Sequence, residues 1–410
     1  MADASYDIAI IGGGIAGLWT QAHLRARGNR VLLIAPTLGG GQTIASQGII
    51  HGGVKYALGG ISGDDSKAIA EMPEAWRQAM AGEAIVDLRK ARLLSETCLL
   101  WTKAGVGARL MGAAAAKTIR AKPRRLGGEE RPAAMRGAGR GVEVYALPEP
   151  VLDVASLVEA LRGEGQAQGA FPGEIGFEVA GGHVREVRLG ESRVEVRGVV
   201  LAGGAGNGLL LEGLGGNHDG RVEGVEGIAM QRRPLHMVMA RRIGGDADAR
   251  GELPEIFGHC VGMSPRPIAT ITTGRDRAGR RVWWIGGQVA EDGVGMTREQ
   301  LIEHAKKEVG ACVPWVDLSG TEWATWRVDR AEGGTGGRKP EGPTVFVAGN
   351  VVTLWPTKLA FAPKAAEMVE TEIAKLGVPK SGEGVGEEPL GLSPPRVAAA
   401  PWDEREVAWS

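Results

Sequence analysis

A glycine-rich turn close to the start of the chain constrains the fold more than any other feature. Positions 12–17 read Gly-Gly-Gly-Ile-Ala-Gly, after an apolar run at Tyr6–Ile11 and before a helical pattern at Leu18–Arg27. A second apolar run follows at Val31–Ile34. Strand, turn, helix and strand in this order predict a βαβ unit with a right-handed connection. The N-terminus of such a helix attracts phosphates through its N–H groups and its dipole, so we expect a dinucleotide site here.

Three of these glycines have distinct expected roles, and one nearby position departs from the usual pattern. Gly12 permits the tight turn, Gly14 lets the phosphates approach the backbone, and Gly17 lets the helix pack closely on the strand. An acidic residue is expected about 20 residues further on, where it binds the ribose hydroxyls. The chain has Ala35 at that place. We therefore expect Thr37 or a backbone carbonyl to take over the ribose contact.

Bulk properties narrow the class of protein. The 410 residues are too many for one simple core and suit two intertwined domains. A formal net charge of −1 gives no reason to expect nucleic acid or an anionic membrane as a partner. Cys98, Cys260 and Cys312 are far apart, which predicts neither a disulfide framework nor a zinc site. Without metal-ligand spacing, a signal peptide or a membrane-length apolar stretch, we expect a cytoplasmic protein that binds no metal.

The remaining pattern predicts a mixed α/β chain. The long glycine-rich loop at 36–60 is typical of a functional loop. The segment from Leu235 to Gln288 is β-rich with intervening turns, which suggests an antiparallel sheet, and the end from Pro379 is expected to be extended or disordered. We expect Asp153 to cap a helix. Helices are expected at 66–80, 95–103, 155–162, 298–309 and 362–376, and further strands at 117–121, 184–189, 194–196, 198–202, 235–241, 268–273, 281–288 and 344–348.

Three segments make the chain similar to a known family. Residues 42–53 read Gln-Thr-Ile-Ala-Ser-Gln-Gly-Ile-Ile-His-Gly-Gly, which resembles the flavin-covering loop of the D-amino-acid oxidase-like FAD superfamily. Its members include glycine oxidase, sarcosine oxidase, L-2-hydroxyglutarate oxidase and glycerol-3-phosphate dehydrogenase, and the SxGxIHxG pattern is closest to the last two. The strand ends at 201–205 and 347–350 also resemble the family, and the element order agrees over roughly residues 5–375.

The resemblance implies an α/β fold in which a Rossmann-like FAD-binding domain (residues 1–85, 146–215 and 340–378) carries an inserted α+β substrate domain (86–145 and 216–339) on an antiparallel sheet, followed by an extended tail (379–410). It also implies hydride transfer from a substrate C–H bond to flavin N5, with reoxidation by oxygen or another acceptor. The expected cofactor contacts are Gly12, Gly13, Gly14, Ile15, Ala16, Gly17, Ala35, Pro36, Gln42, Thr43, Ser46, Gln47, Gly48, Ile49, His51, Ile175, Gly203, Gly204, Gly349, Asn350, Lys358 and Leu359.

Three side chains are candidates for catalysis. A histidine at the place of His51 is bonded covalently to the flavin in some relatives and lies free near the ring in others; the alternative is a loop histidine bonded to backbone. Lys358 is expected near flavin N1 or C2=O, where its charge stabilises reduced flavin, unless it snorkels to the surface. Arg327 corresponds to an arginine that clamps a substrate carboxylate, with Arg330 as second choice. Strand alternation places Arg327 and Asp329 on one face, so the alternative for Arg327 is a pair with an acid.

Aromatic residues and one further histidine are weaker candidates. Pockets are often lined by aromatic side chains, but buried tryptophans also build cores. His259 and residues 263–267 are expected to form a lid or rim. Either a pocket wall or a core position is expected for Trp283, Trp284, Trp323 and Trp326.

The expected function is that of an FAD-dependent oxidase or dehydrogenase acting on a small amine or 2-hydroxy acid. One alternative is a glycerol-3-phosphate dehydrogenase-like enzyme, for whose phosphate only Arg327 and Arg330 are apparent. The other is a flavin-binding subunit without turnover, whose Pro-rich tail docks a partner. The substrate, the electron acceptor and any oligomeric state are left open.

Overall fold

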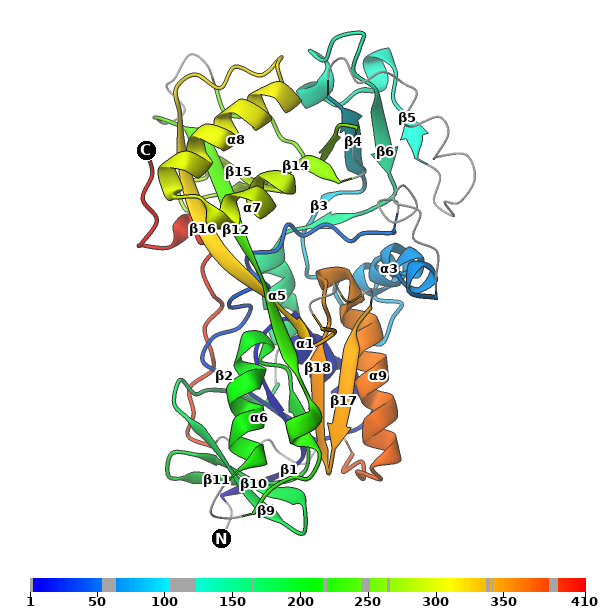
Figure 1. Ribbon diagram of the computed structural model, residues 1–410. Helices are drawn as coiled ribbons and strands as arrows, with labels where there is room; N and C mark the ends of the chain where they lie inside the picture. Colours follow the sequence, from blue (N-terminus) through cyan, green and yellow to red (C-terminus); the bar gives the residue numbers. More distant parts are fainter. Residues whose placement is uncertain are drawn as a thin grey trace.

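The computed structural model describes residues 3–53, 64–103, 123–163, 166–216, 220–244, 251–263, 266–336, 340, 342–382 and 390–410. Two eight-stranded sheets occupy the two halves of an elongated molecule (Figure 1). A small third sheet pairs β3 (Leu93–Ser95) with β7 (Val151–Leu152). The boundaries expected for the two domains stay a prediction.

The first sheet is mainly parallel, because its strands are connected through helices. Its strands lie in the order β17 (Thr344–Ala348), β18 (Val351–Trp355), β11 (Ser192–Leu201), β1 (Ala4–Ile11), β2 (Val31–Ala35) and β8 (Gln168–Ala170). Only β17 runs antiparallel to its neighbour on this path. The hairpin of β9 (Ile175–Ala180) and β10 (His183–Leu189) continues from β11. The expected βαβ unit is therefore present, with β1 paired in parallel to both β2 and β11.

Helices cover both faces of this sheet, which explains its apolar strands. On one face lie α1 (Ile15–Ala26), α3 (Asp64–Ala81), α5 (Val154–Arg162) and α9 (Ala362–Lys375). On the other face lies α6 (Asn207–Gly215). Asp153 caps α5 as expected, since its Oδ1 accepts a hydrogen bond of 2.8 Å from the Ser156 N–H.

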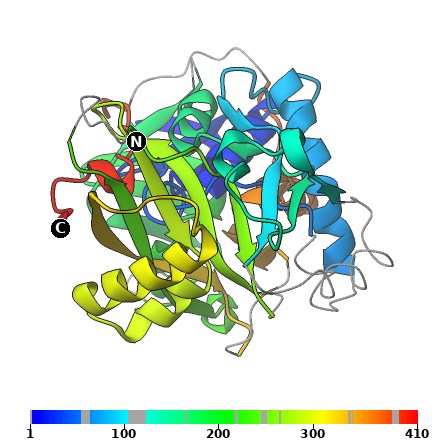
Figure 2. The ribbon, with the colours of Figure 1, turned by 90° about the horizontal axis from the view of Figure 1, so that it is seen from above.

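The second sheet is antiparallel except for one pair, which agrees with the expected substrate-side sheet. Its strands lie in the order β16 (Thr321–Gly333), β12 (Met230–Arg242), β15 (Arg281–Gly286), β14 (Pro267–Arg275), β13 (Gly258–Val261), β4 (Cys98–Thr102), β6 (Val144–Leu147) and β5 (Arg124–Arg125). The parallel pair is β4 with β13. Both α7 (Gln288–Asp292) and α8 (Arg298–Cys312) pack on this sheet, and Figure 2 shows α8 lying across one face. The long strands β12 and β16 extend into the other half of the molecule (Figure 1).

One expectation about secondary structure needs correction, and another cannot be compared with the structure. The helix expected at 95–103 is instead the strand β4, whose five residues are buried on both faces and pair with β6 and β13. A short, wholly apolar run carries no period that separates a buried strand from a helix. The strand expected at 117–121 lies outside the described residues. The expected helices at 66–80, 298–309 and 362–376 are confirmed as α3, α8 and α9 within a few residues.

The end of the chain packs along the molecule over residues 390–410. Val397 forms a parallel bridge with Leu38, and the Trp402 ring lies 6.0 Å from that of Trp284. Ser410 exchanges backbone hydrogen bonds with Trp323. This described part of the tail is therefore ordered and touches both large sheets.

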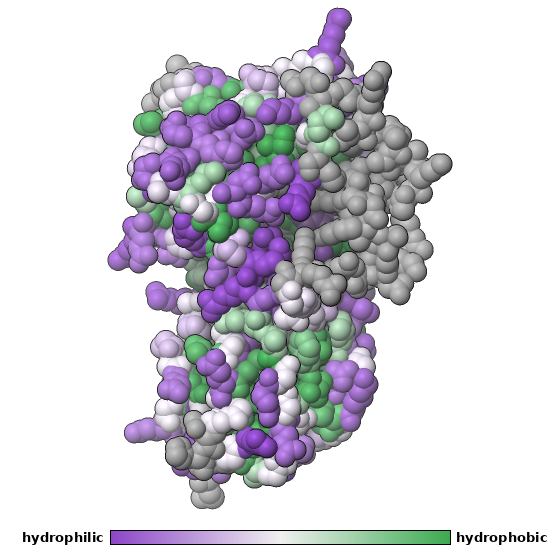
Figure 3. Space-filling model, in the orientation of Figure 1, coloured by the Kyte–Doolittle hydropathy of each residue, from purple (hydrophilic) through white to green (hydrophobic). Residues whose placement is uncertain are grey.

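Several general properties follow from the fold. The cysteines at 98, 260 and 312 are buried and form no disulfide within the described residues, and the neighbouring Cys312 thiol together with burial raises the pKa of Cys260. No helix within the described ranges is long and apolar enough to cross a membrane. On the face drawn in Figure 3, hydrophobic and hydrophilic residues are interspersed, and the middle of the molecule is mainly hydrophilic.

Candidate active site

The glycine turn joins β1 to α1 in a backbone shape that requires glycine. Gly12 has a φ of +126°, and a Cβ there would lie 2.4 Å from the carbonyl carbon and oxygen of Ala202. A Cβ on Gly17 would lie 1.9 Å from the Gly12 carbonyl oxygen, so α1 packs directly on the turn. At Gly14 the nearest atom to such a Cβ is the Thr43 hydroxyl, at 3.2 Å. The first turn of α1 therefore opens beside Gly14, where the nearest neighbouring atom is the Thr43 hydroxyl.

A cavity of about 2980 Å³ begins at this turn and ends against the second sheet. Its lining includes Gly12 and Lys358 from the first half and Trp326 and Arg330 from β16. Most of residues 396–406 of the tail also line it. Residues of both large sheets therefore contribute to the wall of this one cavity.

All the residues expected to contact the cofactor line this cavity, except Gly17, Ala35, Gly349 and Asn350. Gly17 faces β1, as described above, and the Ala35 side chain is 1% exposed within the core beneath the turn. Thr37, the alternative to the absent acid, does line the cavity.

The expectation for Gly349 and Asn350 is corrected by their place in the sheet. They form the β17–β18 turn, at the end of the sheet opposite the glycine turn, because Val351 begins β18 and Trp355 ends it near the cavity. The Asn350 side chain is buried, donates to the carbonyls of Val184 and Arg197, and accepts from the Val184 N–H. These two residues fix the turn and do not reach the cavity.

Residues 42–47 of the loop after β2 tie the two sheets together. The Thr43 hydroxyl accepts a 3.0 Å hydrogen bond from the Ile15 N–H, at the start of α1. The Gln47 amide donates to the backbone carbonyls of Thr270 and Trp284 in the second sheet. Ser46 also lines the cavity, and its hydroxyl is buried without a hydrogen-bond partner among the described residues.

The segment after β18 carries strain at the cavity wall. Thr357 has a φ of +61°, which makes it the one non-glycine residue with positive φ in the described ranges. Its hydroxyl donates to the Gly342 carbonyl at 2.7 Å, and this bond holds the unusual backbone shape. The next residue, Lys358, lines the cavity with its Nζ 4.9 Å from the centre of the Phe361 ring. Strain of this kind is common where a backbone must aim a functional side chain.

Asn207 is a structural residue at this site that sequence reasoning did not identify. Its side chain is fully buried, accepts from the Gly203 N–H at 2.7 Å, and donates to the carbonyls of Leu201 and Leu354. It therefore joins the cavity-side ends of β11 and β18. A single asparagine in a glycine-rich stretch gives no local signal of such a role.

The two arginines on β16 both line the cavity but differ in their contacts. Arg327 donates to the carbonyls of Val294 and Met296, both at 3.0 Å, on the α8 side of the sheet. The opposite face carries Trp326 and Val328, which pack in one cluster with Ala45 of the loop after β2. Alternation along the strand puts Arg330 on that face. The Arg330 guanidinium lies 3.8 Å from Glu291 of α7.

The four tryptophans divide between core and cavity. Trp283 and Trp323 belong to the core beneath α8. Trp284 is 1% exposed and donates from Nε1 to the Ala45 carbonyl at 3.0 Å. Trp326 alone among these four lines the cavity.

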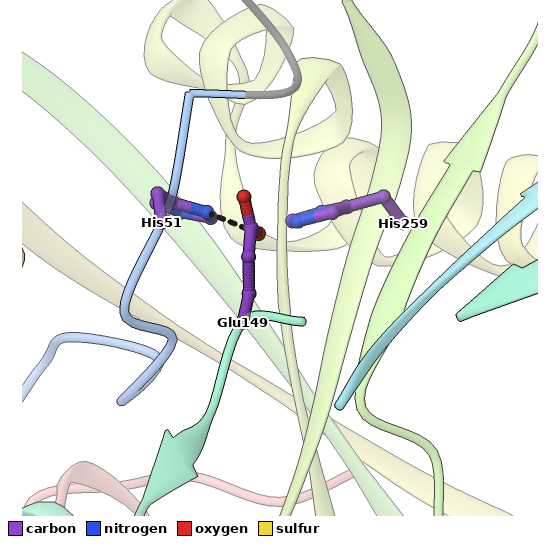
Figure 4. A group of neighbouring side chains, drawn as sticks. All are labelled: His51, Glu149 and His259. Atoms are coloured by element: carbon purple, nitrogen blue, oxygen red, sulfur yellow. Dashed lines mark hydrogen bonds and ion pairs between the residues drawn. The ribbon is translucent and has the colours of Figure 1, made fainter. Parts of the chain in front are cut away.

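His51 stands in a cluster with Glu149 and His259 (Figure 4). Its Nδ1 lies 3.2 Å from Glu149 Oε2, while Glu149 Oε1 accepts a 2.7 Å hydrogen bond from the Gly52 N–H. The His259 ring points toward the same carboxylate, and its centre is 5.4 Å from that of His51. Glu149 and His259 are 1% and 0% exposed. His259 was expected at a lid or rim, and it is instead fully buried beside the cavity wall.

A glycine turn on a parallel sheet, opening into a long cavity against a second, antiparallel sheet, defines the class of dinucleotide-dependent oxidoreductases. The chain belongs to the FAD dependent oxidoreductase (DAO) family, whose family model matches residues 7–354. This confirms the resemblance stated above, the fold class and the choice of FAD as cofactor.

Individual relatives agree with this assignment. The chain is 40% identical over 384 residues to the probable FAD-dependent oxidoreductase PA4991 of Pseudomonas aeruginosa, over 91% of this chain and 92% of that protein. The crystal structure of PA4991 has a TM-score of 0.79 at 35% identity and covers 98% of both chains. Glycine oxidase from Geobacillus kaustophilus shares the fold, with a TM-score of 0.61 at 16% identity over 95% of this chain and 99% of that one.

The residues present fit FAD. The N-terminus of α1 suits a pyrophosphate, and the absence of a side chain at Gly14 leaves room for it beside the Thr43 hydroxyl. Lys358 supplies a positive charge to the same cavity. The protein is thus an FAD-dependent oxidoreductase, and the residues that line the cavity fit its cofactor.

Proposed function

We propose that the protein oxidises a small amine or a 2-hydroxy acid at the end of the cavity that meets the second sheet. The observation that carries this proposal is the continuity of the cavity from the glycine turn to Trp326 and Arg330. Bound FAD supplies the hydride acceptor for such a reaction. The protein's own contribution is to bind the substrate, orient its C–H bond and exclude water.

Arg330 supports a substrate that carries a carboxylate. A guanidinium offers two parallel N–H donors, which match the two oxygens of a carboxylate. Trp326 and Val328 share its face of β16 and provide an apolar wall for a small side chain. Glu291 lies 3.8 Å from the Arg330 guanidinium and is 43% exposed, so a well-placed ligand carboxylate can compete with it.

Lys358 supports hydride acceptance by the flavin. It follows the cavity-side end of β18, and Thr357 holds the backbone that directs it. A cation held in a partly enclosed cavity stabilises negative charge on a reduced flavin more strongly than the same cation in water. We therefore assign Lys358 to that role.

The glycerol-phosphate alternative is less well supported. A phosphate dianion requires several cations, and Arg233, which also lines the cavity, forms a two-pronged pair with the buried Glu332. Arg327 also lines the cavity, but its guanidinium is already bonded to the carbonyls of Val294 and Met296. The arrangement around Arg330 suits a single carboxylate better than a phosphate.

The experiment is anaerobic mixing of the purified FAD-loaded protein with a panel of amines, amino acids, 2-hydroxy acids and glycerol 3-phosphate. The proposal expects loss of the visible absorbance of oxidised flavin with at least one carboxylate-bearing amine or hydroxy acid. Reduction by glycerol 3-phosphate alone would establish the alternative enzyme. A flavin that no compound reduces, but that dithionite does, would identify a subunit without this activity.

A further inference from the structure

The cluster of His51, Glu149 and His259 has the composition of a metal site. We propose that it binds one divalent transition-metal ion of the zinc class, at the wall of the cavity. Each residue offers one ligand atom, and these atoms lie within 4.8 Å of one another (Figure 4). Among the described residues it is the one group of this kind. Two imidazoles and one carboxylate form a common donor set for zinc and related ions.

The groups behind the ligands hold them in suitable orientations. His259 Nδ1 lies 2.8 Å from the Thr270 hydroxyl, so its Nε2 is directed toward Glu149. Glu149 Oε1 is held by the Gly52 N–H, which leaves Oε2 turned toward His51. Histidine ligands of metals usually donate their second ring N–H to an oxygen, and ligating carboxylates are usually hydrogen-bonded in the same way. The cluster therefore has outer contacts typical of a metal centre.

Electrostatics favour a cation at this place. Glu149 is 1% exposed, and a carboxylate removed from water requires compensating positive charge or several hydrogen bonds. A divalent ion supplies that charge while both imidazoles stay neutral and act as ligands. The alternative is a protonated His51, in which case the cluster is a hydrogen-bonded network without metal.

The geometry also indicates which kind of metal site this is. In a tetrahedral zinc site, bonds of about 2.0–2.1 Å place the ligand atoms roughly 3.3 Å apart. The His51–Glu149 pair already has 3.2 Å between its atoms. The ligand atoms lie within 4.8 Å of one another, and His51, whose side chain is 26% exposed and lies on a loop, is the ligand with the most freedom to move toward the others. His51 and Glu149 line the cavity, so the fourth ligand position faces it, as in sites that bind water or a substrate oxygen.

The test measures metal binding directly and requires no turnover, so its outcome is independent of the proposed oxidation. FAD-loaded protein is stripped with a chelator, and Zn²⁺ affinity is measured by competition with a chromophoric chelator. Co²⁺ difference spectra then report nitrogen and oxygen ligation. We expect one ion per chain, with affinity at least about ten-fold weaker in Glu149→Gln and His259→Gln. His304→Gln is the matched control, because His304 lies on α8 near Asp292 and outside the cluster.

Variants of buried residues require a check that they fold. Circular dichroism and FAD content provide it, and His51→Gln serves as a further variant because His51 is the most exposed of the three ligands. The proposal is overturned if the wild-type protein binds no Zn²⁺ or Co²⁺ at one equivalent. It is equally overturned if folded variants bind as tightly as the His304→Gln control. Either result would establish the metal-free hydrogen-bond network.

Discussion

Replacing Gly17 with alanine sets two effects of opposite sign against each other. Gly17 lies in the first turn of α1, and alanine is favoured over glycine inside a helix by about 0.5–1 kcal/mol. However, a Cβ at this position would lie 1.9 Å from the Gly12 carbonyl oxygen. A backbone atom cannot rotate aside, so α1 must move away from β1, and overpacking of this kind costs about 1–3 kcal/mol. The contact is severe, so we expect the upper end of that range and a net loss of about 2 kcal/mol.

The assay for this prediction compares Gly17→Ala with a second helical glycine. Gly310 lies in α8 and does not line the cavity, and an added Cβ there meets no atom within 4 Å. Gly310→Ala should therefore stabilise the protein by about 0.5–1 kcal/mol. Unfolding in denaturant gives both free energies, and gel filtration followed by absorbance gives the FAD content, which should fall only in Gly17→Ala. Equal stability and equal FAD content in the two variants would refute the reasoning.

Three further predictions concern single residues. Asn207→Ala removes hydrogen bonds to Gly203, Leu201 and Leu354 and should lower the free energy of unfolding by about 1–3 kcal/mol, measured in denaturant. Lys358→Met should lower the flavin reduction potential in a redox titration, because reduced flavin loses a stabilising cation. Lys364→Met is the control, since the Lys364 side chain is exposed. An unchanged potential in both variants would contradict the role assigned to Lys358. Burial lowers the pKa of His236, so the unfolded chain binds a proton more readily and stability should fall as the pH drops below about 6.5. The loss of stability at acid pH should be smaller in His236→Gln than in the wild type. Identical profiles of stability against pH for the two proteins would contradict this role of His236.

Local motifs made the nucleotide end of the site predictable. The glycine turn lies between a strand and a helix, so its conformation is set by neighbours within a few positions. The loop at 42–53 carries a recognisable pattern for the same reason. Each of these two motifs is a continuous stretch of chain, so its pattern can be recognised in the sequence. The expected cofactor contact of Asn350 was wrong, because the motif alone does not tell at which end of the sheet its turn lies. Asn350 is in the β17–β18 turn, at the end of these strands far from the cavity.

The parts of the site that could not be predicted depend on packing between residues that are far apart in the sequence. Glu149 and His259 meet His51 only because β4 pairs with both β6 and β13, although Glu149 is 98 residues away from His51 along the chain. The spacing of these three residues in the sequence does not predict that their side chains lie together. Alternation on β16 separates Arg327 from Arg330 by face, but it does not predict that both arginines line the cavity. β4 itself was misread because its buried run carries no period.

The most direct test of the proposed function is anaerobic flavin reduction in the wild type beside Arg330→Met and Arg327→Met. With a substrate from the panel, the proposal predicts that Arg330→Met raises the half-saturating substrate concentration by roughly ten- to hundred-fold, the equivalent of about 1.5–3 kcal/mol for a hydrogen bond to a charged group. Arg327→Met should change it little, because that guanidinium is bonded to Val294 and Met296. Equal effects of the two substitutions, or the absence of any amine or 2-hydroxy acid that reduces the flavin, would contradict the account.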